Sequence, residues 1–428
     1  MSIARLCVRR SGTQPLDFCF ASFAFDPLDI ERLIPDRRRL RSLVYLCMDG
    51  VSEDGLPSFL LPALYLERLE IWGNEDFPLP ALFPNTPRCL RELVVSRGTP
   101  CPADQFGSLT SLNLLCQTYT DGDIYPLLST LRCCPHLEEL FLQSEFRSAE
   151  EPQRPQEPKT TPIPLHSLKR LHICRLPPGV TKRILGALDL LPNGICMRLT
   201  NISADLGAIF PEGISSELSP RAATKLEVIY PSAGGTILHA TNGVAHTRLT
   251  YPPNHPPGYH IFRWIAGGAR ERYSLKELWL HLDRSGRYEV PPPHAFPDLE
   301  TLVIESDPNE FFEFMLFLML RPNKDGVPSP LLSILELRNV FGVGMFGDVL
   351  KARSDAGFRL KTLRIGWSNC CTERMAPLDQ LVDNLEFYHV TGGESRGLDL
   401  PKECMTRSRW WEPWSREFVG VMECEVGW

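Results

Sequence analysis

The sequence predicts an α/β fold: a leucine-rich-repeat solenoid, or horseshoe, with a parallel sheet on its concave side and helices or loops on its convex side. Hexamers of the form L-x-x-L-x-L recur, and from Leu40 to Leu168 their first leucines lie 19 to 31 residues apart. That period is typical of repeats that each contribute one short strand. Candidate amphipathic helices and many of the 39 prolines lie between the hexamers, which favours strand-plus-helix repeats over a flat all-β coil.

The clearest hexamer is L-E-E-L-F-L, from Leu137 to Leu142. Its apolar positions 1, 4 and 6 match neither a helical face nor a strict strand alternation, but they match a repeat whose neighbours complete the core. The other clear hexamers begin at Leu40, Leu66, Leu90, Leu109, Leu168, Leu275, Leu299, Leu332, Leu360 and Val382. Segments 195–201, 223–228 and 246–251 each lack an apolar anchor and are doubtful repeats.

The chain is predicted to form three consecutive parts. Residues 1–39 are a capping strand, preceded by a turn at Ser11, and a segment leading into the repeats. Residues 40–400 are the solenoid, interrupted at 148–164 by a predicted disordered insertion that is rich in proline and charge and almost without apolar side chains. Residues 401–428 are a tryptophan-rich cap or tail.

Three convex helices are expected, at 123–134, 260–272 and 309–320. In the first, Asp123 can cap the helix, and apolar residues from Ile124 to Leu131 repeat at i, i+3, i+4 and i+7. At the C-terminus, a solenoid leaves its last repeat uncovered. We therefore expect Trp410, Trp411 or Trp414 to fold back over the repeat at 382–387. The alternative is that these rings form an exposed binding patch.

Composition and charge narrow the class of partner. A formal net charge of −7 argues against broad binding to nucleic acid or to a membrane surface, which needs a basic field. The 14 cysteines form no C-x-x-C pair, so no zinc site is predicted, and a reduced compartment is the simpler interpretation. The N-terminus has no signal-peptide pattern. We expect a cytoplasmic or nuclear monomer that binds neither nucleic acid nor membrane.

One glycine motif suggests a different function. Residues 342–347 read G-V-G-M-F-G, the G-x-G-x-x-G of dinucleotide sites, which also require an acidic residue about 20 positions later. The next strand ends at Gly366-Trp367-Ser368 without a carboxylate, so a repeat turn is the preferred interpretation. No catalytic, cofactor or metal residue is predicted and the protein is expected not to be an enzyme. The alternative is a small-ligand or nucleotide-binding protein, or an enzyme, that uses the Gly342–Gly347 loop.

The concave face is where a partner is expected to bind. In each hexamer, residues 3, 5 and 7 point away from the core because side chains alternate along a strand. Exposed aromatic and arginine side chains at such positions are typical of binding hot spots. The candidate protein-binding residues are Arg68, Glu70, Trp72, Glu139, Phe141, His172, Trp279, His281, Glu336, Arg338 and Tyr388. The alternative is that they only pack against one another.

Several segments resemble one family. The L-x-x-L-x-L strands with C-P-x-L before them, the opening R-S-G-T-Q-P-L-D-F and the tail R-W-W-E-P-W resemble the F-box/leucine-rich-repeat proteins of mushroom-forming (basidiomycete) fungi. The resemblance implies repeats that recruit a substrate to a cullin-type ubiquitin ligase, and an F-box that binds a Skp-type adaptor. The repeats begin so early that no F-box fits before Ser11, so the adaptor is expected only if an F-box exists upstream.

Overall fold

The computed structural model describes residues 3–22, 36–47, 65–78, 89–99, 104–119, 124–144, 161–190, 194–202, 206–210, 220–231, 235–252, 261–266, 275–282, 291–292, 294–306, 316, 319–339, 346–367, 378–390, 397–408, 411 and 413–414. The chain divides into two compact units, Met1–Leu191 and Pro192–Trp428. We call them unit 1 and unit 2 and describe each by itself. Both are α/β units built on a mostly parallel sheet.

Unit 1 contains a sheet whose strand order follows the chain. Its strands are β1 (Leu16–Ser22), β2 (Leu40–Cys47), β3 (Arg68–Pro78), β4 (Glu92–Thr99), β5 (Ser111–Gln117), β6 (Glu139–Ser144) and β8 (Arg170–Cys174). Each pairs in parallel with the next. Every clear hexamer of this part therefore supplies one strand, and the expected strand after Ser11 is β1.

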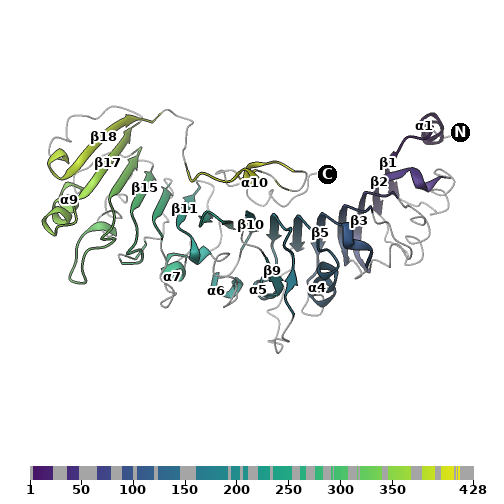
Figure 1. Cartoon of the computed structure of the whole chain (residues 1–428), viewed down its shortest axis with the longest axis horizontal. Coiled ribbons are helices and arrows are strands. Elements are labelled where there is room, and N and C mark those ends of the chain that lie inside the picture. The colour runs from purple at the N-terminus through teal and green to yellow at the C-terminus, as the bar shows by residue number, and fades with distance from the viewer. Residues whose placement is uncertain are drawn as a thin grey trace. The chain divides into compact units, whose positions relative to one another are not determined.

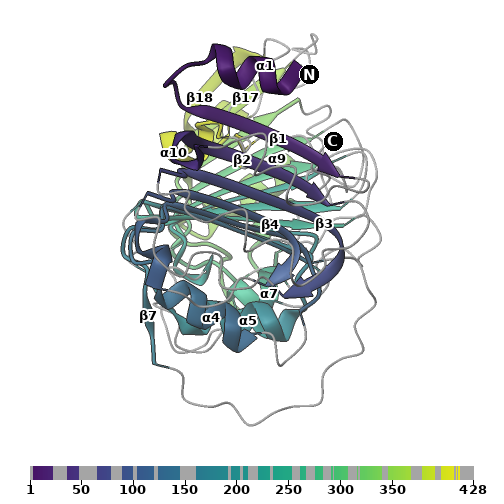
Figure 2. The ribbon, with the colours of Figure 1, turned by 90° about the vertical axis from the view of Figure 1, so that its right-hand side faces the viewer.

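Helices α4 (Ile124–Arg132) and α5 (Pro178–Ala187) lie on one side of the sheet of unit 1, whereas α1 (Ile3–Arg10) lies beside β1 (Figure 2). A two-stranded parallel pair, β7 (Ile163–Pro164) and β9 (Leu188–Asp189), and the 3-10 turns η1 (Arg37–Arg39) and η2 (Asp104–Ser108) complete the unit. Helix α4 buries the predicted stripe from Ile124 to Leu131. Its predicted cap, Asp123, lies outside the described residues.

Unit 2 has a longer sheet with an irregular beginning. Its strands are β10 (Ile195–Thr200), β11 (Lys225–Tyr230), β12 (Thr236–Thr241), β13 (Ala245–Tyr251), β14 (Glu277–Leu282), β15 (Thr301–Ser306), β16 (Ile334–Arg338), β17 (Leu360–Trp367) and β18 (Val382–His389). They lie in the order β10-β13-β12-β11-β14-β15-β16-β17-β18. From β11 through β14 to β18 every neighbour is parallel.

Strand β12 was not predicted, and it breaks the parallel pattern. It is antiparallel to both β11 and β13, so the three doubtful repeats are strands but not consecutive parallel ones. The turn into β13 explains the hairpin: Asn242 Oδ1 accepts from the backbone N–H groups of Val244 and Ala245. Gly243 has a φ of +85°, which glycine adopts without steric cost. A strictly parallel sheet is therefore wrong at this point of the chain.

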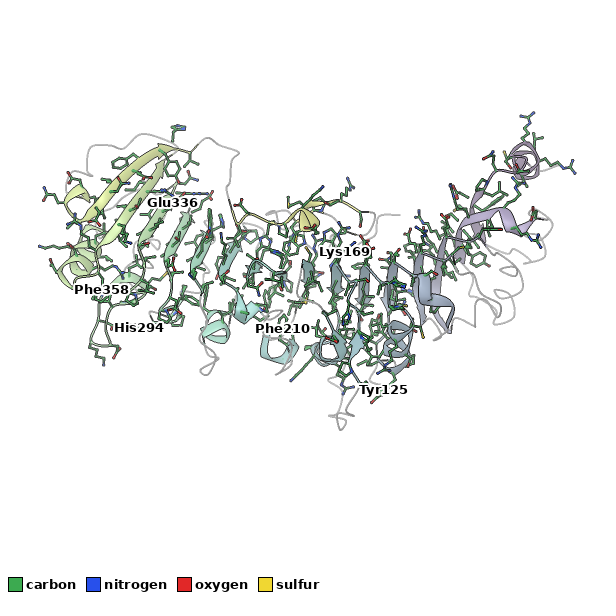
Figure 3. The ribbon with its side chains drawn as sticks, viewed as in Figure 1. Tyr125, Lys169, Phe210, His294, Glu336 and Phe358 are labelled. Atoms are coloured by element: carbon green, nitrogen blue, oxygen red, sulfur yellow. The ribbon has the colours of Figure 1, made fainter. Side chains whose placement is uncertain are left out.

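The helical elements of unit 2 are α6 (Leu206–Ile209), α7 (Ile261–Ala266), α9 (Phe346–Asp355) and α10 (Lys402–Met405), with 3-10 turns η3 (Pro220–Ala222) and η4 (Leu378–Gln380). In Figure 1, α6 and α7 lie on one side of the strands and α10 on the other. Figure 3 shows Phe210 among the helices and Glu336 on the strands. We call the side that carries Trp279, Glu336 and Arg338 the polar face of unit 2.

The leucine at the fourth hexamer position forms the core. Leu69, Leu140 and Leu278 are buried as predicted, and burying each stabilises the fold by roughly 1.5–3 kcal/mol. Leu385 does not follow this rule, because it is only half-buried and its neighbour Phe387 is 43% exposed. Strand β18 is the last strand in the sheet order, so it receives a neighbouring strand on one side only.

Three predicted segments fall largely outside the described residues. Of the insertion at 148–164, only 161–164 are described, and they include β7. Disorder of the insertion stays a prediction for residues 148–160, which lie outside the described residues. The loop Gly342–Gly347 is described only at Phe346 and Gly347, which begin α9. Helix α7 lies within the predicted 260–272, and of 309–320 only Leu316, Met319 and Leu320 are described.

Candidate functional site

The polar face of unit 2 is organised as rows of side chains that cross the strands. Because paired residues of neighbouring strands point to the same face, the register places each row directly. One row reads Arg198, Arg248, His239, Glu227, Trp279, Val303, Glu336, Arg364 and Glu386 from β10 to β18. Two residues further along the strands, the next row ends with His281, Glu305, Arg338, Gly366 and Tyr388.

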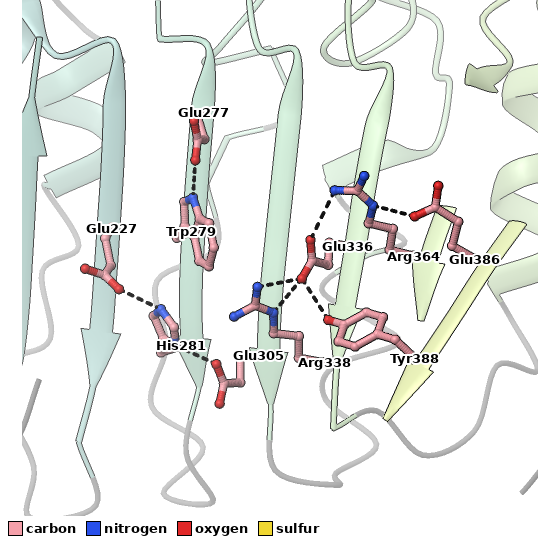
Figure 4. Close-up of polar contacts among 10 residues, drawn as sticks. All are labelled: Glu227, Glu277, Trp279, His281, Glu305, Glu336, Arg338, Arg364, Glu386 and Tyr388. Carbon is pink, nitrogen blue, oxygen red and sulfur yellow. Dashed lines mark hydrogen bonds and ion pairs between the residues drawn. The ribbon is translucent and has the colours of Figure 1, made fainter. Parts of the chain in front are cut away.

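Glu336 is the centre of the best-defined cluster (Figure 4). Its Oε1 accepts from Arg338 Nε at 2.6 Å and from the Tyr388 hydroxyl at 2.7 Å. Arg364 Nη1 lies 3.9 Å from Glu336 Oε2, and Arg364 Nε donates to Glu386 Oε2 at 2.8 Å. Glu336 and Arg338 are buried, whereas the Arg364 and Glu386 side chains are 42% and 43% exposed. The cluster thus runs from a buried ion pair to a solvent-exposed one.

Burial and charge shift the pKa values in this cluster. Burial would lower the pKa of Arg338, but the charge and hydrogen bond of Glu336 outweigh it and raise that pKa. Burial, followed by the hydrogen bond to Glu336, raises the pKa of the Tyr388 hydroxyl well above its ordinary value. Tyr388 therefore remains a neutral donor at physiological pH, and Arg338 remains charged.

Trp279 joins this cluster to the preceding strands. Its indole Nε1 donates to Glu277 Oε1 at 2.6 Å, between residues two apart on β14. The Arg338 guanidinium carbon lies 4.7 Å from the centre of the Trp279 ring, which is within the range of a cation–π contact. Trp279 is therefore fixed both at its edge and over its face.

A second cluster surrounds the buried carboxylate of Glu227. His239 Nδ1 lies 2.8 Å from Glu227 Oε2, and His281 Nε2 lies 2.9 Å from Oε1. His281 Nδ1 in turn lies 3.2 Å from Glu305 Oε2. Burial would raise the pKa of Glu227, but the hydrogen bonds and charges of His239 and His281 hold it well below its ordinary range. Burial would lower the pKa of His281, but Glu227 and Glu305 raise it.

The predicted residues of unit 1 form two smaller groups. On β3, Arg68 Nε and Trp72 Nε1 donate to the two oxygens of Glu70, at 2.7 and 3.2 Å. Burial raises the pKa of Glu70, opposed by the charge of Arg68 and the hydrogen bond from Trp72. The pair of Glu70 and Trp72 repeats the i, i+2 arrangement of Glu277 and Trp279.

The second group of unit 1 lies on β6 and β8. Arg170 forms an ion pair with Glu139 across the two strands. Two register positions along, the rings of Phe141 and His172 lie 4.5 Å apart between centroids. The candidate residues of unit 1 therefore contact their strand neighbours in pairs, and the three on β3 share one carboxylate.

The expected exposure of the candidate residues is wrong for most of them. Glu70, Trp72, Phe141, His172, Trp279, His281, Glu336 and Arg338 are buried, and Arg68, Glu139 and Tyr388 are half-buried. Adjacent strands lie close enough for side chains of the same row to contact one another and to exclude solvent. Packing against one another, the alternative stated from the sequence, therefore accounts for the burial of these side chains.

The C-terminal tail occupies part of the polar face, which corrects the predicted position of the cap. Trp411 and Trp414 form a buried cluster with Cys404 and with Cys196 of β10. They do not cover the repeat at 382–387. Leu398 packs on Trp279 and Val303. The polar face offers these rings buried partners. Most residues of β18, the last strand, are exposed or half-buried. Trp410 lies outside the described residues.

Several members of the Glu336 and Glu227 clusters were not predicted from the sequence. Arg364 and Glu305 occupy positions 5 and 7 of their hexamers, and Glu227 occupies position 5 of a doubtful one. The register rule, applied to every hexamer, would have found all three. His239 had no such signal because β12 contains no hexamer.

Within the described ranges, no three His, Cys, Asp or Glu side chains are grouped so as to hold a metal ion. Among the described helices, none has both the length and the apolar character that crossing a bilayer requires. Comparison with protein-family models found no match for this chain, and a search of curated proteins found none either.

Proposed function

We propose that the chain is a non-enzymatic scaffold that binds a protein partner through the polar face of unit 2. The observation that carries this proposal is the cluster around Glu336, in which charged and aromatic side chains are already held in place by their neighbours. Side chains ordered before binding lose little conformational entropy when a partner arrives. Trp, Tyr and Arg are also the residue types that dominate protein-binding energy.

The exposed end of the cluster defines where the partner makes contact. Arg364, Glu386 and the exposed Asn384 lie on neighbouring strands, with Asn384 Nδ2 donating to Glu386 Oε1 at 2.6 Å. Both charge signs are present within this small area. A partner segment with paired acidic and basic side chains complements it, and such complementarity sets specificity and association rate.

We also propose that the strands belong to a leucine-rich-repeat solenoid, like the substrate-recruiting region of an F-box subunit of a cullin-type ubiquitin ligase. Support comes from the coincidence of each clear hexamer with one strand, and from the chain-following strand order of β1 to β8 and of β14 to β18. The Skp-type adaptor enters this proposal only through an F-box encoded upstream of Met1. Reading the genomic sequence there tests that part.

Panning a random peptide library against the purified chain tests the binding function. Selected peptides should bind Arg364→Ala at least tenfold more weakly than the unaltered chain. Lys361→Ala is the matched control, since Lys361 is an exposed cation on the same strand, outside the two rows that carry the cluster. Equal binding to both variants, or no selected peptide at all, would contradict the proposal. Calorimetric binding of a nucleotide would instead favour the ligand-binding alternative.

A further inference from the structure

The described residues of segment 397–414, which are 397–408, 411 and 413–414, lie along the polar face of unit 2 and run opposite to the strand order. Leu398 packs on Trp279 of β14 and Val303 of β15. Further along the segment, Cys404 packs on Cys196 of β10. Figure 1 shows α10 on the side of the strands away from α6 and α7. The segment therefore covers the first part of the same rows that carry the Glu336 cluster.

The two tryptophans meet polar side chains of these rows. The Arg198 guanidinium carbon lies 4.9 Å from the centre of the Trp411 ring. Trp414 stacks on His239, with centroids 5.5 Å apart and an interplanar angle of 21°. A cation beneath one indole and an imidazole beneath the other select for aromatic rings rather than for aliphatic side chains.

The segment keeps much of its hydrogen bonding to itself. Trp414 N–H donates to the Cys404 carbonyl at 3.1 Å, and Trp411 Nε1 donates to the same oxygen at 3.3 Å. Thr406 N–H donates to the Lys402 carbonyl, and Ser408 N–H donates to that of Trp411. The segment is thus a compact turn whose anchoring side chains, rather than a continuous strand, fix it to the sheet.

The fit of this turn to the face is incomplete. Trp414 Nε1 is buried without a hydrogen-bond partner among the described residues, and a buried unpaired donor costs roughly 1–3 kcal/mol. The side chains between the anchors, including Asp399, Lys402, Glu403 and Met405, are exposed. A partner that pairs the indole donor would bind the same surface better than the segment does.

We propose that segment 397–414 is an intramolecular occupant of the polar face, displaced by a partner segment that presents an aliphatic side chain followed by two closely spaced tryptophans. The inference rests on the proposed binding function and specifies the chemistry of the partner. Trp279 is the shared element, because it contacts both Leu398 and Arg338. Displacement of the segment therefore frees a surface that is continuous with the Glu336 cluster.

A labelled synthetic peptide of residues 397–414, with Cys404 replaced by Ser, provides the probe. It should bind the full chain carrying Trp411→Ala and Trp414→Ala at least tenfold more tightly than the unaltered chain, because the face is then vacant. Lys402→Ala, an exposed change in the same segment, should bind the probe no better than the unaltered chain. A probe lacking both tryptophans should bind neither.

Thiol alkylation in the unaltered chain gives a second measurement that needs no variant. Cys196 of β10 and Cys404 of the segment lie in the same buried cluster, and both are fully buried. Excess probe should increase the alkylation rate of Cys404 at least tenfold, and a tryptophan-free peptide should leave it unchanged. The inference is wrong if the double variant unfolds. It is also wrong if the probe binds the double variant no more tightly than the unaltered chain and leaves the alkylation rate of Cys404 unchanged. In either case the segment is a permanent part of the core.

The two proposals fail differently. If library peptides bind and depend on Arg364 while the 397–414 probe does not bind, the binding function stands and the intramolecular occupant does not. If neither the library nor the probe yields binding, the proposed function itself is wrong.

Discussion

The Tyr388 hydroxyl donates a hydrogen bond of 2.7 Å to Glu336 Oε1, and it passes over a whole strand to do so. Tyr388 lies on β18 and Glu336 on β16, with β17 between them. The residue of β17 that pairs with Tyr388 is Gly366. Because glycine has no side chain, the tyrosine ring can lie across β17 at that position.

Gly366→Ala should break this contact. A Cβ at residue 366 would lie 2.6 Å from Tyr388 Cζ and 2.7 Å from Val390 Cγ2, closer than such atoms can approach. The ring must move, and overpacking of this kind costs roughly 1–3 kcal/mol. Urea unfolding should show that loss. Gly347→Ala, at a helical glycine with nothing within 4 Å, is the control and should be neutral or stabilising. Equal stability of both variants would mean that the ring is not confined.

The two arginines around Glu336 should differ sharply in their contribution. Arg338→Met leaves the buried Glu336 carboxylate without its closest cation, and breaking a buried pair costs roughly 3–5 kcal/mol. Arg364→Met removes a largely exposed partner, for which less than about 1 kcal/mol is expected. Free energies of unfolding for both variants, measured by denaturant titration, check the contrast. Similar losses would show that burial does not govern this network.

The joint contribution of His281 and His246 to the free energy of unfolding should be greatest near pH 6.5. The pKa of His281 is raised above its ordinary value of 6.5, so its stabilisation is complete below that pH and is lost as pH rises through the folded-state pKa. The pKa of His246 is lowered from 6.5, chiefly by burial, so stability is lost there as pH falls below 6.5. Each proton contributes a slope of at most about 1.4 kcal/mol per pH unit.

His281→Gln separates these two effects. The variant should lose the decline on the alkaline side and keep the decline on the acid side, as measured by urea midpoints between pH 5 and 9. An unchanged alkaline slope would show that another group causes it.

Arg353 should fix the loop before β16 to helix α9. Its buried guanidinium donates to the carbonyls of Pro328 and Ser329, at 2.6 and 3.1 Å, and desolvation lowers its pKa to about 10. Arg353→Met leaves these oxygens without that donor, at roughly 1–3 kcal/mol for each. Hydrogen exchange of residues 327–332 should accelerate. Lys351→Met, exposed on the same helix, should leave exchange unchanged, and a similar effect from both would contradict the anchoring role.

Thiol reactivity should follow burial. Cys7 and Cys19 are exposed and should react quickly with iodoacetamide at pH 8. Cys134 is buried, with its Sγ donating to the Thr130 carbonyl, and desolvation raises its pKa to about 12. Because the thiolate is the reactive form, Cys134 should react only on unfolding. Mass spectrometry of peptides after short labelling checks this order, and early labelling of Cys134 would mean that α4 opens readily.

The strands were predictable because their signal is local. A hexamer such as 137–142 carries its apolar positions within a few residues, and its strand β6 appears where expected. Strand β12 has no such signal, since T-I-L-H-A-T lacks the leucine spacing of the hexamers. Its pairing depends on β11 and β13 lying on either side, and one hexamer at a time cannot show that.

The sequence predicted the face on which several of the candidate residues lie, but not their burial. The register rule correctly selected Trp279, Glu336 and Tyr388 for one face, because alternation is a property of each strand. Their burial depends on contacts between strands, such as the one over Gly366. The position of Trp411 and Trp414 depends on partners in β10 and β12. Those residues are far away in the sequence. The prediction that the tail covers the repeat at 382–387 considered only the end of the solenoid and was therefore wrong.

Strand β12 also constrains the order in which unit 2 can assemble during synthesis. Further along this sheet, from β15 to β18, each new strand can pair with the strand made just before it. Strand β11 cannot do so, because the neighbour of β10 on that side is β13. An unpaired strand edge is a template for other chains. Nascent chains that end between Thr200 and Tyr251 should therefore be the most prone to aggregate, until β11, β12 and β13 close the gap together.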